Sequence, residues 1–154
     1  LIRDEYDKTF YLFAGKIALK NHDPEQAKQY LQEAIALDPE YMEAILVLMS
    51  IYSKEESYDE IISLYEHISS QDFDWTALYP FVAEAYDKEE EFDKAYEMYR
   101  AAYEDFKEDP AFLEKYCYFL LEDGKQEQAK EIAAQLVALD PTEQQYIELL
   151  ERFE

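Results

Sequence analysis

The chain has 154 residues, of which 49% are hydrophobic and 33% are charged, and its formal net charge at pH 7 is −23. Such a charge repels nucleic acids and anionic membranes, and it attracts cations and basic protein segments. It also suits a plain solvated surface without any dedicated site. No apolar run is long enough to span a bilayer, and the single cysteine, Cys117, has no partner for an internal disulfide.

The sequence predicts four pairs of helices in succession. The first helix of the first pair ends at about Lys20, and its second helix spans about 24–37. Asp23 is the N-cap of this second helix, and Pro24 is at its first helical position. The second pair spans about 40–54 and 58–69, and Ser57 and Glu60 have the spacing of a capping box.

The third and fourth pairs follow the same scheme. The third pair spans about 76–88 and 92–106, with Asp74 or Thr76 as its cap and Pro80 within the first turn, where proline is tolerated. The fourth pair spans about 110–122 and 126–139, with Gly124 as a helix stop between them. A last helix at about 143–153 is capped by Thr142, and its apolar stripe consists of Tyr146, Ile147, Leu150 and Phe153.

Apolar residues recur along the chain at a period of 34 residues. Five columns keep this period across all four pairs without an insertion. The columns are Ala27, Ile61, Ala95, Ala129; Leu31, Tyr65, Tyr99, Ala133; Ala34, Ile68, Ala102, Leu136; Tyr11, Ile45, Tyr79, Leu113; and Gly15, Met49, Ala83, Cys117. A fixed period in this range is typical of a stacked repeat array without a single closed core.

The pattern resembles the tetratricopeptide repeat family, whose helical hairpins are 34 residues long. The resemblance implies an all-α solenoid of antiparallel helix pairs that winds as a right-handed superhelix. It covers units of about 8–41, 42–75, 76–109 and 110–143, followed by the end helix, in one array over residues 1–154. The second and third units depart from the family pattern, with Phe73 and Lys107 at the position of Pro39.

The sequence contains no pattern that predicts catalysis or a cofactor. His22 and His67 are far apart and lack ligands at zinc spacing, and the two glycines form no phosphate loop. Cys117 lies in a buried column, where a free thiol behaves as a small hydrophobe. We therefore expect no enzymatic activity, no metal and no cofactor. The abundant tyrosines fall mainly in repeat columns and indicate packing, with Tyr118 the best candidate for recognition.

In tetratricopeptide arrays the first helices of the pairs line a concave groove that binds peptides. By this resemblance the partner-binding residues are Phe13, Lys16, Val47, Ser50, Phe81, Glu84, Asp87, Glu114, Tyr118 and Glu122. Leu12, Leu46 and Val47 are either groove or core residues. One subgroup of the family binds acidic chaperone C-termini through basic groove residues. The column that starts at Lys16 continues with Ser50, Glu84 and Tyr118, so that function does not carry over.

The sequence therefore predicts a protein-interaction scaffold whose partner carries apolar anchors followed by Lys or Arg, docked as an extended or helical segment. Two alternatives remain: a regulatory or targeting domain of a larger enzyme, and a self-association module in which the apolar groove end or the last helix packs on another copy. The chain lacks an initiator Met and is expected to be part of a longer or processed protein. The excess of Lys over Arg suggests a bacterium, and the missing disulfides are compatible with the cytoplasm.

Overall fold

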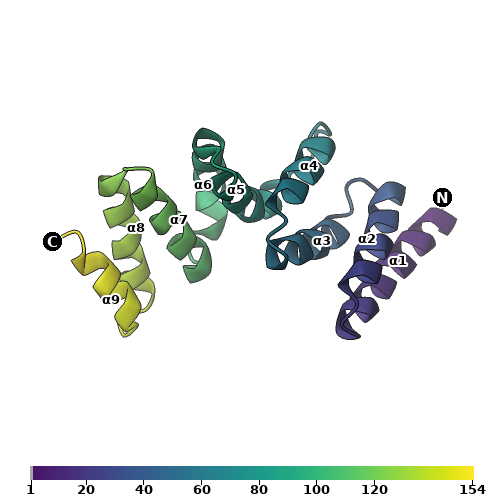
Figure 1. Ribbon diagram of the computed structural model, residues 1–154, viewed down its shortest axis with the longest axis horizontal. Helices are drawn as coiled ribbons and strands as arrows, with labels where there is room; N and C mark the ends of the chain where they lie inside the picture. Colours follow the sequence, from purple (N-terminus) through teal and green to yellow (C-terminus); the bar gives the residue numbers. More distant parts are fainter. Residues whose placement is uncertain (1) are drawn as a thin grey trace. The chain divides into compact units, whose positions relative to one another are not determined.

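In a computed structural model the fold is described for residues 2–154, with side chains from Tyr6 onward. This part of the chain consists of helices and contains no strand (Figure 1). The helices are α1 (Ile2–Lys20), α2 (Pro24–Leu37), α3 (Met42–Lys54), α4 (Tyr58–Ile68), α5 (Tyr79–Lys88), α6 (Phe92–Phe106), α7 (Pro110–Glu122), α8 (Gln126–Leu139) and α9 (Gln144–Glu151), and a 3-10 turn (Thr76–Leu78) precedes α5. The predicted all-α fold of antiparallel helix pairs is confirmed.

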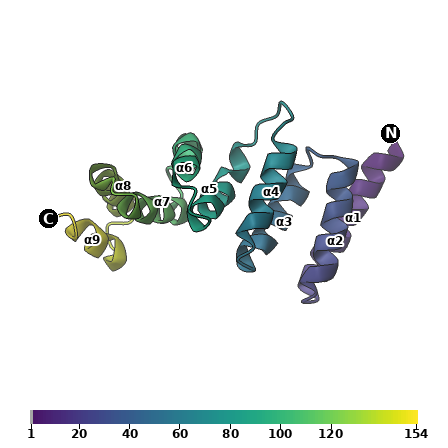
Figure 2. The ribbon, with the colours of Figure 1, turned by 45° about the horizontal axis from the view of Figure 1, so that its top comes forward.

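The chain divides into two compact parts, which we call the N-terminal part, up to Phe81, and the C-terminal part, from Val82. In the N-terminal part α1 pairs with α2, α2 packs on α3, and α3 pairs with α4. In the C-terminal part α6 packs on α7, α7 pairs with α8, and α9 packs on α8 (Figure 2). Within each part these contacts join helices that are neighbours in sequence, as expected of a repeat array.

The predicted columns form the core of both parts. The column of Ala27, Ile61, Ala95 and Ala129 is fully buried in all four repeats. The columns that start at Leu31 and Tyr11 are also buried, except that Tyr65, Tyr11 and Tyr79 stay half-buried. Small residues recur because two helices of a pair approach closely there.

Gly15 lies at such an approach. A Cβ atom at Gly15 would lie 3.0 Å from Cγ of Leu31 and 3.4 Å from the carbonyl oxygen of Ala27. In the fourth repeat the same two columns hold Cys117 and Ala133, so a larger side chain on the first helix faces a smaller one on the second. The helices of a pair thus fit through complementary volumes.

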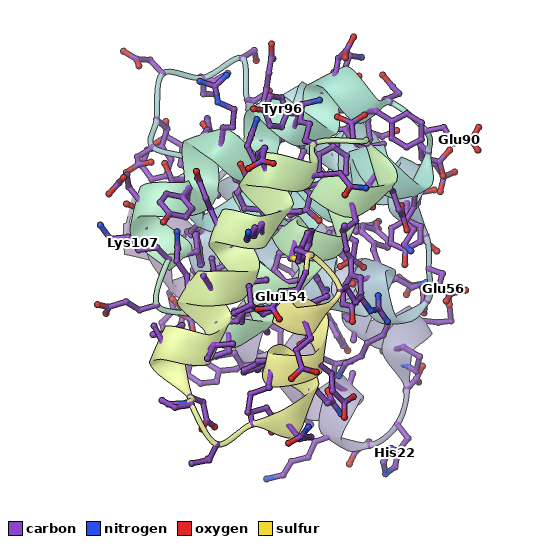
Figure 3. All side chains as sticks on the ribbon, turned by 90° about the vertical axis from the view of Figure 1, so that its left-hand side faces the viewer. His22, Glu56, Glu90, Tyr96, Lys107 and Glu154 are labelled. Carbon is purple, nitrogen blue, oxygen red and sulfur yellow. The ribbon has the colours of Figure 1, made fainter. Side chains whose placement is uncertain are left out.

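The turn inside each helix pair has the same backbone in all four repeats. His22, Glu56, Glu90 and Gly124 lie one period apart, and all adopt the left-handed conformation, with φ of 61°, 56°, 62° and 77°. The next residue donates its N–H to the carbonyl five residues earlier, as in Ser57 N to Tyr52 O at 2.8 Å. This is the Schellman helix stop. Figure 3 shows the side chains of His22, Glu56 and Glu90 pointing away from their turns into open space.

Helix starts follow the prediction in part. Asp23 caps α2, since its carboxylate accepts from the N–H of Gln26 at 3.1 Å. The predicted capping box at Ser57 is wrong, because the Ser57 side chain makes no capping hydrogen bond. Ser57 has φ −88° and ψ 64°, values that Glu91 and Lys125 share at the same place without capping. The Schellman turn therefore sets this backbone, and the side chain is not aimed at the helix.

The last helix differs from the prediction at both ends and at its core contact. Its N-cap is Glu143, whose carboxylate accepts from the N–H of Gln145, so the predicted cap at Thr142 is wrong. The Thr142 hydroxyl instead donates to Asp140 at 2.8 Å. The most buried residue of α9 is Leu149, whereas the predicted stripe residues flank it and stay half-buried.

The joint between α4 and α5 is the least regular segment. Asp74 accepts hydrogen bonds from the N–H and the hydroxyl of Thr76, at 3.0 and 2.6 Å. The N-cap of the 3-10 turn is Trp75, without a side-chain capping bond, so the predicted cap at Asp74 or Thr76 is wrong. Trp75 is 4% exposed, and its indole N–H donates to the carbonyl of Gln71 at 3.1 Å. Pro80 is the second residue of α5, a position where no helical hydrogen bond is lost.

Candidate partner-binding surface

The predicted groove residues of the N-terminal part lie on the first helices of their pairs. Phe13 and Lys16 are on α1, Val47 and Ser50 are on α3, and Phe81 is on α5. Phe13 is 57% exposed and the other four are half-buried. No member of this set is part of the closed core, so all five side chains keep surface for a contact.

Polar groups on this surface are partly committed to one another. The ammonium of Lys16 pairs with the carboxylate of Glu43 at 2.6 Å and joins α1 to α3. The hydroxyl of Ser50 donates to the carbonyl of Val47 at 2.7 Å. Apolar side chains therefore supply much of what this surface offers to a partner.

Leu12 belongs to the core. It is 2% exposed, so the interpretation as a groove residue is wrong for it. Leu12 precedes Phe13 in sequence, but consecutive residues of a helix point to different sides, so the two side chains face different surroundings. Leu46 and Val47 are half-buried and remain at the surface.

The predicted residues of the C-terminal part are on α5 and α7. Glu84 and Asp87 are half-buried on α5. On α7, Glu114 is half-buried, whereas Tyr118, at 42%, and Glu122 are exposed. Glu84 forms an ion pair with Lys115, which links the two helices. This surface is acidic, with the Tyr118 ring as its exposed aromatic group.

Asp87 is the electrostatic centre of this surface. Burial, followed by repulsion from Glu122, raises the pKa of the Asp87 carboxyl above its usual range, and Lys88 offsets this only in part. Glu84 and Asp123 add further repulsion. A cationic group placed beside Asp87 would relieve this repulsion.

Phe13 belongs to a stripe of exposed apolar residues on α1 whose other members sequence reasoning missed. We call it the α1 stripe, and it consists of Tyr6, Phe10, Phe13 and Ile17, which are 75%, 58%, 57% and 59% exposed. The 34-residue period contained a signal for these residues. Phe10 and Ile17 stand one period before two residues of the core, so they occupy positions at which apolar side chains make contacts. Ala44 and Ile51 on α3 are 0% and 4% exposed, against α2 and its neighbours.

The described part of the chain offers neither a side-chain arrangement for a metal ion nor a helix that could cross a membrane. Among its side chains, no group of three or more His, Cys, Asp or Glu is arranged to hold a metal ion. None of the helices in residues 2–154 has the length and apolar character needed to cross a membrane.

Comparison with known proteins identifies the repeats. A family described as tetratricopeptide repeat matches residues 18–84, and a family described as YpiA-like, C-terminal tetratricopeptide repeats, matches residues 78–143. The chain belongs to the tetratricopeptide repeat family. Tetratricopeptide repeat proteins act as protein-interaction scaffolds in general.

One relative is similar over almost the whole array. The TPR repeat-containing protein YpiA of Bacillus subtilis (strain 168) is 38% identical over 151 residues, which is 98% of this chain. The array spans only 36% of the length of that relative. The bacterial origin predicted from composition fits a relative from Bacillus.

Solved structures share the fold at low sequence identity. YrrB, described as a TPR protein with an unusual peptide-binding site, has a TM-score of 0.77 at 17% identity over 93% of this chain and 74% of its own. MamA from Desulfovibrio magneticus RS-1 has a TM-score of 0.81 at 16% identity, covering 96% and 83% of the two chains. Pseudomonas aeruginosa pilF has 0.75 at 19%, covering 97% and 68%.

Proposed function

We propose that this array is a non-enzymatic scaffold that binds a segment of another protein through its first helices. The segment carries apolar anchors for the N-terminal part and Lys or Arg for the C-terminal part. The observation that carries the proposal is the acidic surface around Asp87, where burial and neighbouring carboxylates leave negative charge poorly compensated. A basic segment is the partner that gains most from this charge.

Apolar contacts supply the other half of the proposal. Phe13, at 57% exposure, and the half-buried Val47 and Phe81 offer side chains that a partner can cover. Covering apolar surface contributes roughly 25 cal/mol per Å², whereas exposed charges mainly set the rate of association and its salt dependence. YrrB, a protein of the same fold, is described as having a peptide-binding site, which supports a peptide as the form of the partner.

The double variant Phe81→Ala/Glu84→Lys tests the site. Wild type and variant would be used side by side to capture proteins from lysate of the source organism at low and high salt, with mass spectrometry to identify them. We expect a partner that binds the wild type, is weakened by salt and is lost from the variant. Since Glu84 pairs with Lys115, circular dichroism must show that the variant is folded.

A matched control carries the same two changes on a second helix. Phe92 and Glu97 are exposed on α6, so Phe92→Ala/Glu97→Lys changes charge and apolar surface equally, away from the first helices. The control should retain the partner. Equal capture by both double variants would move the site away from the first helices and contradict the proposal.

A second candidate function is self-association through the α1 stripe. The stripe places four large apolar side chains, 57–75% exposed, on one helix. Contiguous exposed apolar patches of this kind mark interaction sites. The mass of the protein from light scattering over a range of concentrations tests it. A dimer that becomes a monomer in Phe10→Ser/Ile17→Ser would support it, and a monomer at every concentration would remove it.

We place this scaffold in the bacterial cytoplasm. Cys117 is a free, buried thiol, and reduced thiols are the norm in that compartment. Fractionation of cells of the source organism, followed by detection of the protein, tests this location.

A further inference from the structure

The second helices of the N-terminal part enclose a hollow that the proposed function does not use. It lies between α2 and α4, with α3 as its floor, and has a volume of about 450 Å³, within the range of about 300–1,000 Å³ typical of ligand sites. We call it the α2–α4 hollow. Its apolar lining consists of Ile35, Ala36, Pro39, Leu48, Leu64 and Ile68.

The C-terminal part has the equivalent hollow two repeats later, and there it is smaller. Its volume is about 290 Å³, and the residues that line it correspond position by position to those of the α2–α4 hollow. The phenol of Tyr103 donates to Oε1 of Gln135 at 2.6 Å and bridges α6 and α8 across it. At these two positions the N-terminal part has Ile35 and His67, which form no such bridge. The α2–α4 hollow is therefore the larger of the two, and it lacks this bridge.

One end of the α2–α4 hollow is polar and negatively charged. A second depression, lined by Glu25, Lys28 and Glu60 among others, shares Gln32, Tyr52 and Glu60 with the hollow. Lys28 is the only cation of that depression, and it is held by Glu25 at 2.8 Å and by Glu55 at 2.9 Å.

Glu60 is left without a counter-ion. Among the described residues it has no salt-bridge partner, and its carboxylate lies on the border between the apolar and the polar depression. Residues 41–75 as a whole carry one lysine and eight Asp or Glu. An incoming cation beside Glu60 therefore meets uncompensated negative charge from its immediate neighbours and from the surrounding surface.

We propose that the α2–α4 hollow is a second protein-binding site, which takes an apolar side chain of a basic partner segment. The apolar side chain enters between Ile35 and Leu64, and a Lys or Arg nearby in the segment pairs with Glu60. The walls of the site are second helices, and its lining shares no residue with the first-helix surface proposed above. Apolar burial supplies its affinity, and Glu60 selects basic segments over acidic ones.

The C-terminal part supplies the variants that test this site. Ile35→Tyr/His67→Gln, which we call the closed variant, introduces the pair found at 103 and 135 and should bridge and narrow the hollow. Tyr103→Ile/Gln135→His is the matched control, because it removes the bridge on the other part of the chain. Random 12-residue peptides displayed on phage would be selected on the wild-type protein and then measured on both variants, with thermal unfolding as the check of folding.

We expect enriched peptides with an aliphatic or aromatic residue and a Lys or Arg within about four positions, the distance of one helical turn. Their affinity should fall at least about tenfold on Ile35→Tyr/His67→Gln, because an apolar side chain loses its site, and stay unchanged on the control. Glu60→Gln should weaken binding and reduce its salt dependence. Phe81→Ala/Glu84→Lys should leave these peptides bound.

Three results would overturn the proposal. The first is a set of enriched peptides that bind the closed variant as well as the wild type. The second is enrichment without basic residues. The third is a dimer that dissociates in the closed variant, since the occupant would then be a second copy. If Ile35→Tyr/His67→Gln does not fold, Ala36→Trp replaces it. Ala36 is exposed and lines the hollow, so the indole ring of the new tryptophan would cover the hollow without changing the core.

Discussion

Glu56 and Gly124 occupy the same position in turns two repeats apart, and both have a left-handed backbone, with φ of 56° and 77°. Only Gly124 adopts this conformation without strain, because a Cβ atom crowds the backbone there. Nothing lies within 4 Å of a Cβ built at Gly124, so a side chain at this position is disfavoured by the backbone conformation and not by a clash with neighbouring atoms. Three of the four turns therefore carry a conformational cost that the fourth avoids.

Replacement of Glu56 by glycine should stabilise the protein. We expect Glu56→Gly to raise the free energy of unfolding by about 0.5–1 kcal/mol, the net of relieved strain and the greater freedom of the unfolded chain. Gly124→Ala should lower it by about 1 kcal/mol. Thermal unfolding of both variants measures this, with Glu56→Ala as the control that removes the charge alone. A destabilised Glu56→Gly would show that the Glu56 side chain itself holds the turn.

Gly15→Ala should destabilise the first repeat. The new methyl group would lie 3.0 Å from Cγ of the fully buried Leu31, so the Leu31 side chain or the helix that carries it must shift. We expect a loss of about 1–2 kcal/mol, which is typical of overpacking. Leu31→Val in the same chain should restore part of it, since the fourth repeat combines a larger residue, Cys117, with a smaller one, Ala133. Urea unfolding of the single and double variants measures the effect, and additive losses would contradict it.

Asp87→Asn should stabilise the protein at pH 7. The pKa of the Asp87 carboxyl is raised in the fold above the usual 3.8, first by burial and then by Glu122, so the ionised carboxylate costs stability at pH values above its folded pKa. As the pH falls through that pKa the carboxyl takes up a proton and the cost disappears. The advantage of Asp87→Asn should therefore shrink on acidification and vanish below about pH 3.8.

Unfolding temperatures at several pH values measure this advantage. Glu127→Gln, an exposed change on α8, is the control for the loss of one negative charge. An advantage that stays constant down to acidic pH would mean that the Asp87 carboxylate is not the source.

Cys117 should be inert in the native protein. Its thiol is buried, Sγ lies 3.3 Å from the carbonyl oxygen of Ala129, and burial raises its pKa to about 11. Only about one thiol in a thousand is then ionised at about pH 8, and the reactive thiolate is shielded as well. We expect the disulfide reagent DTNB to react at least about a hundredfold faster in guanidinium chloride than with the native protein, as followed by absorbance. Equal rates would mean that α7 opens readily.

Caps and contact surfaces show where sequence reasoning stops. Asp23 was predicted correctly, because its carboxylate caps α2 through local geometry that the sequence encodes. Ser57 was not, because the backbone of the preceding Schellman turn fixes its orientation. Leu12 and Phe13 are neighbours in sequence, yet one is 2% and the other 57% exposed. The second helix of the pair decides this difference.

The sequence by itself determined the all-α array, its four helix pairs and its buried columns. It did so because every repeat buries the same face of its helices against its neighbours, which imposes the 34-residue period on apolar residues such as Ala27 and Ala129. Only the tertiary structure decided that Lys16 pairs with Glu43 and that Ile35 and His67 leave a hollow where Tyr103 and Gln135 form a bridge. Such pairings depend on the length and direction of two side chains that meet across helices, and the period of the sequence contains neither.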